Sequence, residues 1–292
     1  MRKQVLRKRY ILLFISGAFV ITGAVFFLRP AAVLVTDELF VSLYGERRIR
    51  LKTMETSLKL FRRVEQVFIG ENAGPDMVAF AVEQHRARPY AVLFPYRYIE
   101  GALRYKEEFP TIPVYVFGET RQNPHVENIS FIEADTQVDL YRAGIAAGVW
   151  GGNDEGYVYF FYSDSLPQEE RSIFEEGLKS QGYERSPVYI SGNQAFFENQ
   201  NISCAVVRGQ GSQLFDANLD IPIILFSWID PNITTPQVKV VFDDSPWAIF
   251  VKALRARKST EIPSAITILE DRIKEREVLK GLRRIAGNIP KM

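Results

Sequence analysis

The fold of this chain is decided by residues 90–117, which read YAVLFPYRYIEGALRYKEEFPTIPVYVF. The apolar run at 90–94 predicts a buried strand, residues 97–108 predict a helix, and the apolar run at 112–117 predicts a second strand. Two strands joined by a helical crossover pair in parallel. The strands are apolar along their whole length, which indicates a sheet that is covered on both faces.

The same alternation of strand and helix runs outward from this stretch in both directions. Further strands are predicted at 31–36, 64–69, 129–133, 157–162, 188–190, 202–207, 221–226 and 238–242. Further helices are predicted at 75–88, 138–150, 168–181, 246–257 and 264–285. A turn at 151–156 with three glycines interrupts the pattern near its middle. The sequence therefore predicts an α/β fold with two similar lobes, each a parallel sheet flanked by helices.

The first 30 residues differ from the rest of the chain. They contain six basic residues and no acidic one, and residues 10–28 carry no charge. At about 1.5 Å per residue such a run is roughly 28 Å long, which matches the hydrocarbon core of a bilayer. We favour an uncleaved signal anchor, because the run is longer than the apolar region of an ordinary signal peptide; a cleaved signal peptide is the alternative. The basic flank then stays in the cytoplasm.

These patterns give the expected domain organisation. Residues 1–30 are the basic flank with the signal anchor or signal peptide, and residues 31–135 form the first lobe. Residues 136–257 form the second lobe, and the C-terminal segment of about 258–292 is expected to complete the first. We expect a single-pass protein of a bacterial inner membrane, with its globular part facing the periplasm or the outside.

Charge and motif content exclude several function classes. After residue 30 the chain carries 30 basic and 35 acidic side chains, so it lacks the basic surface that nucleic acid requires. Its one cysteine, Cys204, lies in an apolar run and is interpreted as a core residue. Too few cysteines and histidines are present for a zinc site. No phosphate-binding loop, dinucleotide fingerprint or nucleophile elbow occurs, so we expect neither a cofactor nor an enzyme.

Polar and aromatic residues recur where the predicted strands end. Ligands of open parallel sheets bind beyond the carboxyl ends of the strands. The candidate ligand contacts are Asp37, Phe40, Phe94, Tyr96, Asp135, Asp164, Trp228, Asp244 and Trp247. Arg97 is a further possible polar contact. Helix capping is the alternative role for the acids, and core packing is the alternative for Phe94 and Trp247. Acids at several strand ends favour an uncharged polyol, sugar or nucleoside, or a cation, over a phosphate.

Residues 128–150, NISFIEADTQVDLYRAGIAAGVW, resemble the basic-membrane-protein family of type I periplasmic solute-binding proteins, which includes bacterial purine-nucleoside receptors. The helix motif of that family is matched by Tyr141, Ala143, Gly144, Ala146 and Ala147. The resemblance implies a two-lobed type I periplasmic-binding-protein-like fold that captures a nucleoside or sugar-like ligand in the interlobe cleft for an ABC importer. It also implies that Asp37 and Phe40 are site positions.

The chain departs from this family in ways that motivate a second hypothesis. The lipoprotein cysteine after the apolar segment is missing, and Val41 stands where the family has asparagine. Tyr159, Phe160 and Phe161 replace residues that are glycine-rich in the family. The alternative function is therefore a ligand-free paralogue that acts as an envelope interaction or scaffold module.

Overall fold

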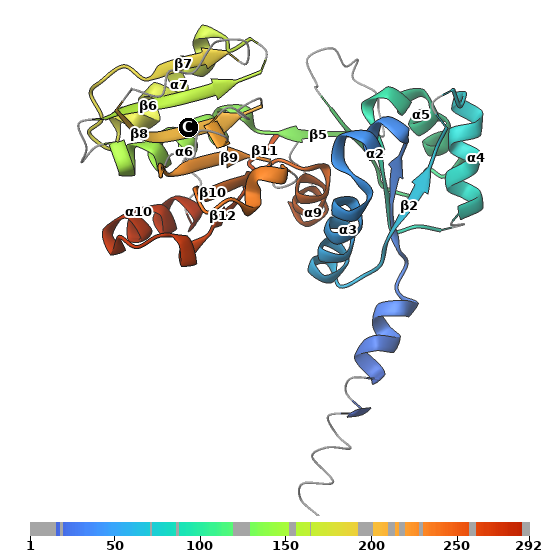
Figure 1. Ribbon diagram of the computed structural model, residues 1–292. Helices are drawn as coiled ribbons and strands as arrows, with labels where there is room; N and C mark the ends of the chain where they lie inside the picture. The colour runs from blue at the N-terminus through green and yellow to red at the C-terminus, as the bar shows by residue number, and fades with distance from the viewer. Residues whose placement is uncertain are drawn as a thin grey trace, which may run out of the picture. The chain divides into compact units, whose positions relative to one another are not determined.

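The computed structural model describes residues 16–17, 20–70, 72–85, 88–118, 129–151, 156–163, 165–191, 201–209, 214–215, 220–227, 230–256 and 261–287 (Figure 1). The chain divides into two compact units, residues 1–132 and 133–292. The described strands form two six-stranded sheets, and the first lies in the first unit except for residues 133–134 and 261–262. Two parallel-sheet α/β lobes are therefore confirmed, and they follow from the alternation of apolar strands and crossover helices.

The first sheet has the strand order β11-β5-β4-β3-β1-β2, and all of its pairings are parallel. Its strands are β1 (Ala32–Thr36), β2 (Val64–Phe68), β3 (Ala91–Pro95), β4 (Val114–Phe117), β5 (Ser130–Ala134) and β11 (Glu261–Ile262). The helices that follow these strands are α2 (Glu38–Tyr44), α3 (Glu46–Leu60), α4 (Pro75–His85) and α5 (Ile99–Glu108), the last preceded by a 3-10 turn at Tyr96–Tyr98. Strand β2 lies at one edge of this sheet.

The core of the first unit lies between this sheet and the pair α4 and α5. Val33, Val92 and Phe94 point from the strands into it, and Val78 and Tyr105 meet them from the helices. Neighbouring residues of a strand point to opposite faces of the sheet. The side-chain partners of two neighbouring residues of β2 therefore show which helix covers each face. The amide of Gln66 donates to Thr53 on α3, whereas Glu65 pairs with His85 on α4. Helices α3 and α4 therefore cover opposite faces of the edge strand.

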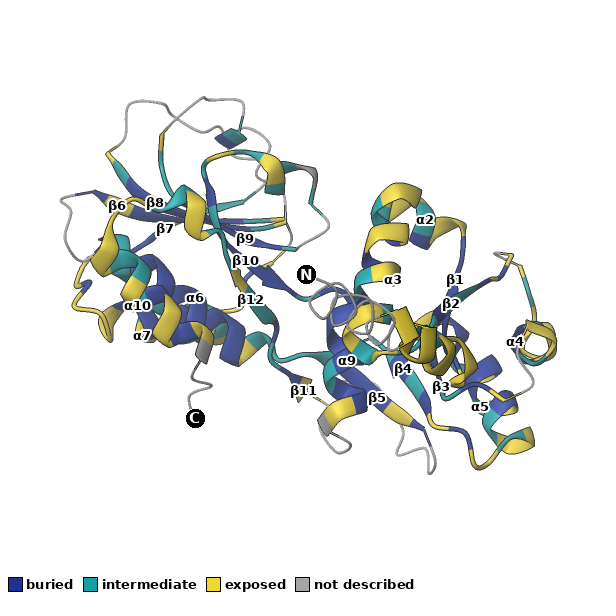
Figure 2. Cartoon of the chain, turned by 90° about the horizontal axis from the view of Figure 1, so that it is seen from below, coloured by how far each residue is buried: buried dark blue, intermediate teal, exposed yellow. Residues whose placement is uncertain are grey.

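The second sheet has the order β12-β10-β9-β8-β6-β7 and is parallel except for β12. Its strands are β6 (Tyr157–Tyr162), β7 (Val188–Ser191), β8 (Ile202–Arg208), β9 (Ile223–Phe226), β10 (Val238–Asp243) and β12 (Ala265–Ile268). The helices of this unit are α6 (Thr136–Gly151), α7 (Gln168–Lys179), α9 (Pro246–Ala256) and α10 (Arg276–Gly287), with 3-10 turns at Pro231–Thr234 and Glu270–Arg272. Figure 2 shows that most of α6 is buried.

Strand β6 is buried on both of its faces. Val158 and Phe160 belong to the cluster that also contains residues of α6, α7 and α10. Tyr159 and Phe161 belong to a second cluster, with Ala205, Val207 and Leu225 among others. The aromatic residues that replace the glycines of the resembled family are thus core residues. The interpretation of Cys204 as a core residue is confirmed, and burial raises the pKa of its thiol.

Helices α6 and α7 touch through their backbones. An added Cβ at Gly144 would lie 2.2 Å from the carbonyl oxygen of Phe174, and one at Gly177 would lie 2.2 Å from the carbonyl oxygen of Tyr141. Real side chains do not approach a backbone atom so closely, so both positions require glycine. The small-residue motif of residues 141–147 therefore serves the contact with α7.

A buried polar cluster ties α6 to the link between β11 and β12. The carboxylate of Asp139 accepts from the backbone N–H of Ser264 at 2.9 and 3.0 Å and pairs with Arg142 at 3.5 Å. Arg142 in turn donates to the carbonyl of Ser264 at 3.0 Å. Burial raises the pKa of Asp139 to about 6, against the lowering effect of these partners. Both groups of the backbone at Ser264 are thereby paired inside the protein.

The C-terminal region needs two corrections. The helix predicted at 264–285 is wrong for its first half, because residues 265–268 form β12, antiparallel to β10, and α10 begins only at Arg276. The β-branched run Ile266-Thr-Ile268 favours a strand. The prediction that residues 258–292 complete the first lobe also differs from the observed topology. Of the described residues there, only β11 joins the first sheet, whereas β12 joins the second.

Helices α2 and α3 were not predicted from the sequence. Helix α3 does not follow the usual rule, because it buries Lys52 and Thr56 beside Ile49 and exposes Leu51, Met54 and Leu58. A search of the sequence for a helix with an apolar face toward the core therefore does not detect α3.

Residues 10–15 and 18–19 of the predicted membrane segment lie outside the described residues. Described residues 20–28 are helical, and the ring of Phe26 lies 5.8 Å from that of Phe61 at the end of α3. In the part of the chain that the structure describes, no helix combines the length and apolarity needed to cross a membrane.

Candidate functional site

The carboxyl end of β1 carries a buried charged cluster centred on Asp37. This residue is the N-cap of α2, and its Oδ1 accepts from the backbone N–H of Phe40 at 2.7 Å. Its Oδ2 accepts from the hydroxyl of Tyr98 at 2.9 Å and pairs with Nη1 of Arg97 at 2.8 Å. The side chain of Asp37 is 2% exposed, whereas that of Arg97 is 37% exposed. The arginine is therefore the part of this cluster that a solute reaches.

The aromatic candidates of the first unit have different positions. Tyr96 is exposed and packs beside Gly118, where an added Cβ would lie 2.6 Å from the Cβ of Tyr96. Phe40 is buried and stacks edge-on against Tyr44 at 4.6 Å. Phe94 is completely buried in the core, which agrees with the alternative interpretation for this residue. Of these three, Tyr96 offers the most accessible ring.

The carboxyl end of the second sheet holds a second charged cluster. Arg208, the last residue of β8, pairs with Glu170 in the first turn of α7 at 2.6 Å. Arg171, the next residue, lies over the rings of Tyr162 and Tyr189 at 5.9 and 4.8 Å. Arg208 is 34% exposed, so its guanidinium combines one protein partner with access to solvent.

The backbone at Ser227, after β9, has a φ of 114°, a strained value for a residue other than glycine.

The two acids that follow β10 have distinct roles. Asp243 is buried, and its Oδ1 accepts from the hydroxyl of Ser245 at 2.6 Å, next to the start of α9. Asp244 is half-buried. Burial, and secondarily the charge of Asp243, raise the pKa of Asp244 to about 7, while Arg208 acts to lower it. A carboxyl group with a strongly raised pKa at the carboxyl end of a parallel sheet is a candidate ligand contact.

The raised pKa of Asp244 predicts a pH-dependent stability. Between pH 4 and 7 the folded protein binds this proton more tightly than the unfolded chain does, so its stability falls as the pH rises. The variant Asp244→Asn should match the parent at pH 4 and exceed it by about 1–2 kcal/mol in unfolding free energy at pH 8. Urea unfolding at both pH values measures this difference. A variant that is less stable than the parent at pH 8 would contradict the assignment.

The remaining candidates are less informative. Asp135 accepts from the backbone N–H of Val138 at 3.0 Å and so caps the first turn of α6, the alternative role for an acid at a strand end. Trp247 is buried within α9. Asp164 and Trp228 lie outside the described residues. Among the residues that the structure describes, no three or more His, Cys, Asp or Glu side chains gather in a way that suits a metal ion.

Arg208 and Glu170 were missed by the sequence analysis, which looked for acids and aromatic rings at strand ends. The signal was present, because Arg208 directly follows the apolar run 202–207 and precedes a glycine. Its partner on α7 is 38 residues earlier in the chain. Nothing in the sequence relates two positions so far apart, so only the folded chain pairs them.

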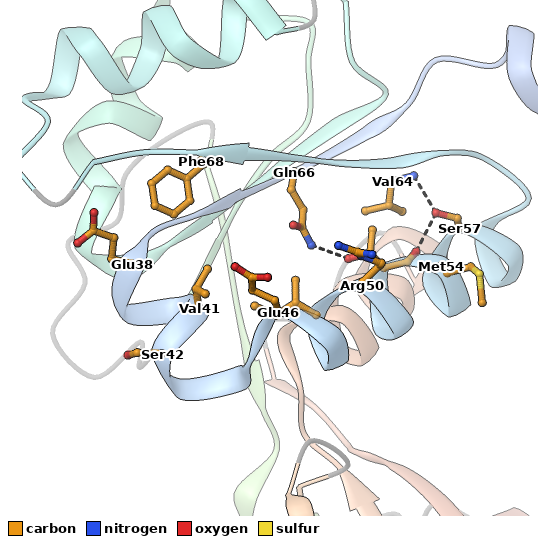
Figure 3. Close-up of a pocket in the computed structure, with 12 residues that line it drawn as sticks. Glu38, Val41, Ser42, Glu46, Arg50, Met54, Ser57, Val64, Gln66 and Phe68 are labelled. Carbon is orange, nitrogen blue, oxygen red and sulfur yellow. Dashed lines mark hydrogen bonds between the residues drawn. The ribbon is translucent and has the colours of Figure 1, made fainter.

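A separate groove runs along the edge of the first sheet. It has a volume of about 900 Å³ and lies between β2 and the pair α2 and α3. Figure 3 shows Phe68, Gln66 and Val64 of β2 on one side and Val41, Arg50 and Met54 on the other. The dashed line between Gln66 and α3 is the hydrogen bond to Thr53, 2.7 Å long. This groove contains none of the predicted ligand contacts.

Comparison with known proteins identifies the fold. No protein-family model matches the chain, and no curated protein does. A transcriptional activator of the comK gene from Bacillus halodurans superposes with a TM-score of 0.60 at 12% identity, over 90% of this chain and 100% of that one. A solute-binding protein of an ABC transporter system from Conexibacter woesei gives 0.54 at 16% identity, over 90% and 98%.

AraP, an arabinose-binding protein from Geobacillus stearothermophilus, gives a TM-score of 0.50 at 16% identity, over 82% of this chain and 96% of that one. At these identities the similarity establishes the fold alone. The chain has the type I periplasmic-binding-protein-like fold, and ABC solute-binding proteins are among its structural neighbours.

Proposed function

We propose that this chain is a non-enzymatic solute-binding protein for a small, uncharged, polyhydroxylated ligand such as a sugar or a nucleoside. The observation that carries the proposal is the pair formed by Arg208 and Glu170, together with Asp244, at the carboxyl end of the second sheet. The guanidinium supplies hydrogen-bond donors, and the carboxyl groups supply acceptors. Hydroxyl groups need both kinds of partner, because each one donates and accepts.

Arg97 and Tyr96 extend the same chemistry in the first unit. Arg97 is held by Asp37, and Tyr96 offers an exposed ring on which a sugar or base can stack. AraP is described as an arabinose-binding protein, which supports a sugar-like ligand. A fold by itself does not define a function, and another neighbour is described as a transcriptional activator, so the proposal rests on the site residues.

We further propose that the protein belongs with the basic-membrane-protein branch of this fold, on the strength of the motif at residues 141–147. In this proposal residues 10–28 tether it to a bacterial inner membrane, with the globular part outside the cytoplasm. The partner that receives the ligand is an ABC importer.

Thermal unfolding of the full chain in mild detergent, followed by tryptophan fluorescence, tests the binding proposal. The compounds are neutral sugars, nucleosides and, for contrast, amino acids. A ligand at 100 times its dissociation constant should add about 2.7 kcal/mol of stability. We expect one sugar or nucleoside class to raise the melting temperature by several degrees. The variant Arg208→Met should weaken binding by roughly 5- to 150-fold, because it leaves polar groups of the ligand without partners.

The matched control is Lys179→Met, which removes an exposed cation at the other end of α7 and should leave the shift unchanged. Asp37→Ala is a poor probe, since this change also removes a helix cap and leaves Arg97 without its partner. Cooperative melting with no shift for any compound would contradict the proposal.

The result without any shift would favour the alternative, a ligand-free envelope interaction module. One observation supports that alternative. Both carboxylate oxygens of Asp37, a site position of the resembled family, are already engaged by groups of this protein.

A further inference from the structure

Three arginines gather where the N-terminal apolar segment meets the first unit. Arg29 directly follows the apolar run 10–28, and Arg62 and Arg63 lie between the end of α3 and the start of β2. The strands that these two segments enter, β1 and β2, are parallel neighbours in the first sheet. The arginines therefore lie at the amino end of this sheet, whereas the candidate ligand contact Asp37 lies at its carboxyl end.

Arg29 and Arg62 each bind the segment that carries the other. Nη1 of Arg29 donates to the carbonyl oxygen of Phe61 at 3.5 Å, and Nη1 of Arg62 donates to the carbonyl oxygen of Pro30 at 2.7 Å. A guanidinium group carries five N–H donors, and these bonds use only Nη1. The protein therefore holds both side chains at the junction, and the bonds that hold them do not use the donors on Nε and Nη2.

Both arginines also lie over aromatic rings. The guanidinium carbon of Arg62 is 3.5 Å from the centre of the Tyr90 ring, and that of Arg29 is 5.2 Å from the centre of the Phe61 ring. Contacts of this kind attract a cation to the face of the ring. The two guanidinium groups are thus held in place from two directions, by a carbonyl oxygen and by a ring.

The charges of this cluster are only partly balanced by the protein. Nη1 of Arg63 pairs with Glu65 at 3.3 Å. Among the described residues, no ion pair includes Arg29 or Arg62. Burial lowers the pKa of Arg62; Tyr90 opposes this effect and the positive charge of Arg29 adds to it, so the two cations are close enough to repel each other. An anion bound beside both would offset that repulsion.

The position of these two arginines along the chain indicates where the anion comes from. In the tether proposed above, residues 10–28 span the hydrocarbon core, so Arg29 begins at the depth of the lipid headgroups. The ring of Phe26, near the end of the apolar run, lies 5.8 Å from that of Phe61, which places Arg62 beside the same end. Tyrosine, the residue at position 90, is enriched at this depth of a membrane.

We propose that Arg29 and Arg62 form a binding site for the phosphate group of a membrane phospholipid, where the N-terminal tether joins the first unit. The planar guanidinium group donates two parallel hydrogen bonds to a phosphate, which a lysine cannot do. A bound headgroup holds the start of β1 at the membrane surface. This inference rests on the proposed tether. A free phosphate ion has the same chemistry, and the experiment below separates the two sources.

Anisotropy titrations of the full chain in nonionic detergent with fluorescent lipids test the site. The probes are phosphatidylglycerol, which is anionic, and phosphatidylcholine, which carries a phosphate but no net charge. An arginine near an anionic surface contributes roughly fivefold to affinity. The parent chain should therefore bind phosphatidylglycerol at least tenfold more tightly than phosphatidylcholine, and the double variant of Arg29→Gln with Arg62→Gln should lose this preference.

The matched control is Arg276→Gln with Lys280→Gln, which removes two exposed cations one turn apart on α10 and should leave the preference unchanged. Arg29→Gln alone changes an exposed residue and should lower the preference roughly fivefold, even if the double variant folds poorly. A parent chain without the preference, a single variant that keeps all of it, or a control that loses it would overturn the proposal.

Inorganic phosphate is the probe for the other source. In detergent without phospholipid, phosphate should leave the melting temperature of the parent chain where chloride of equal ionic strength leaves it. A rise with phosphate that the double variant lacks would assign the site to a free phosphate ion and overturn the lipid.

Alkaline carbonate extraction of membranes tests the tether separately. The parent and the double variant should both stay in the membrane fraction, because their apolar runs are identical. Release of both chains would contradict the tether and the lipid together. Retention of both chains without a lipid preference would contradict the phosphate site alone.

Discussion

Gly144→Ala is expected to lower the unfolding free energy by about 2–4 kcal/mol, although alanine is the better helix former. The added methyl group would lie 2.2 Å from the carbonyl oxygen of Phe174 and 3.0 Å from the Cα of Gly177. The obstacle is the backbone of α7, which cannot rotate away as a side chain can. Helices α6 and α7 must separate, and the contacts around their crossing weaken. Urea unfolding followed by circular dichroism measures the loss.

The matched control is Gly281→Ala on α10, which packs against α6 from another side. There the added methyl group would meet only side-chain atoms of Val149, at 3.3 Å. The gain in helix propensity of up to about 1 kcal/mol should make this variant neutral or more stable. The double variant of Gly144→Ala with Gly177→Ala should cost less than the sum of the two single changes, since one substitution already separates the helices. A Gly144→Ala protein with parental stability would show that the two backbones are not in contact.

Arg142→Met is expected to lower the unfolding free energy by about 3–5 kcal/mol at pH 8. The change removes the arginine that pairs with the buried carboxylate of Asp139 and leaves the carbonyl of Ser264 without its donor. The loss should be smaller at pH 5. Burial already raises the pKa of Asp139 to about 6, and removal of the arginine raises it further, so at pH 5 the carboxyl group is protonated and uncharged.

The second change Asp139→Asn, added to Arg142→Met, provides the control. Asparagine still accepts from the backbone N–H of Ser264 but carries no charge. The double variant should therefore recover part of the stability at pH 8 and show little dependence on pH. An Arg142→Met protein with the same loss at pH 5 and pH 8 would show that the charge of Asp139 is not the cause.

Much of the fold was predictable because several of its strands, such as β1, β3 and β9, are continuous apolar runs. Residues 90–117 gave a strand, a helix and a strand, and the structure has β3, α5 and β4 there. No helix was predicted at α3, where Leu51, Met54 and Leu58 face outward, and at residues 265–268 a strand of four residues was merged with a helix. Local periodicity reports which residues are apolar but does not report what covers them.

The candidate site was less predictable than the fold. Asp37 and Asp135 were found because acids at strand ends are visible in the sequence, yet both cap helices. The more accessible Arg97 was considered only as a possible contact, and Arg208 was overlooked. The pairing of Arg208 with Glu170 depends on β6 and β8 being neighbours in the sheet, because Glu170 belongs to the helix that follows β6 and Arg208 ends β8.

The sequence by itself determined that this chain forms two parallel sheets with crossover helices, because burial on both faces needs continuous apolar strands and helices to cover them. It also determined that polar residues stand at the ends of those strands. Only the tertiary structure decided which of these residues cap a helix, as Asp37 does, and which keep access to solvent, as Arg208 does. It also decided that Gly144 meets Gly177 and that the leucines of α3 face water. Each of these outcomes depends on distances between segments that are far apart in the chain. The sequence of a single segment carries no information about those distances.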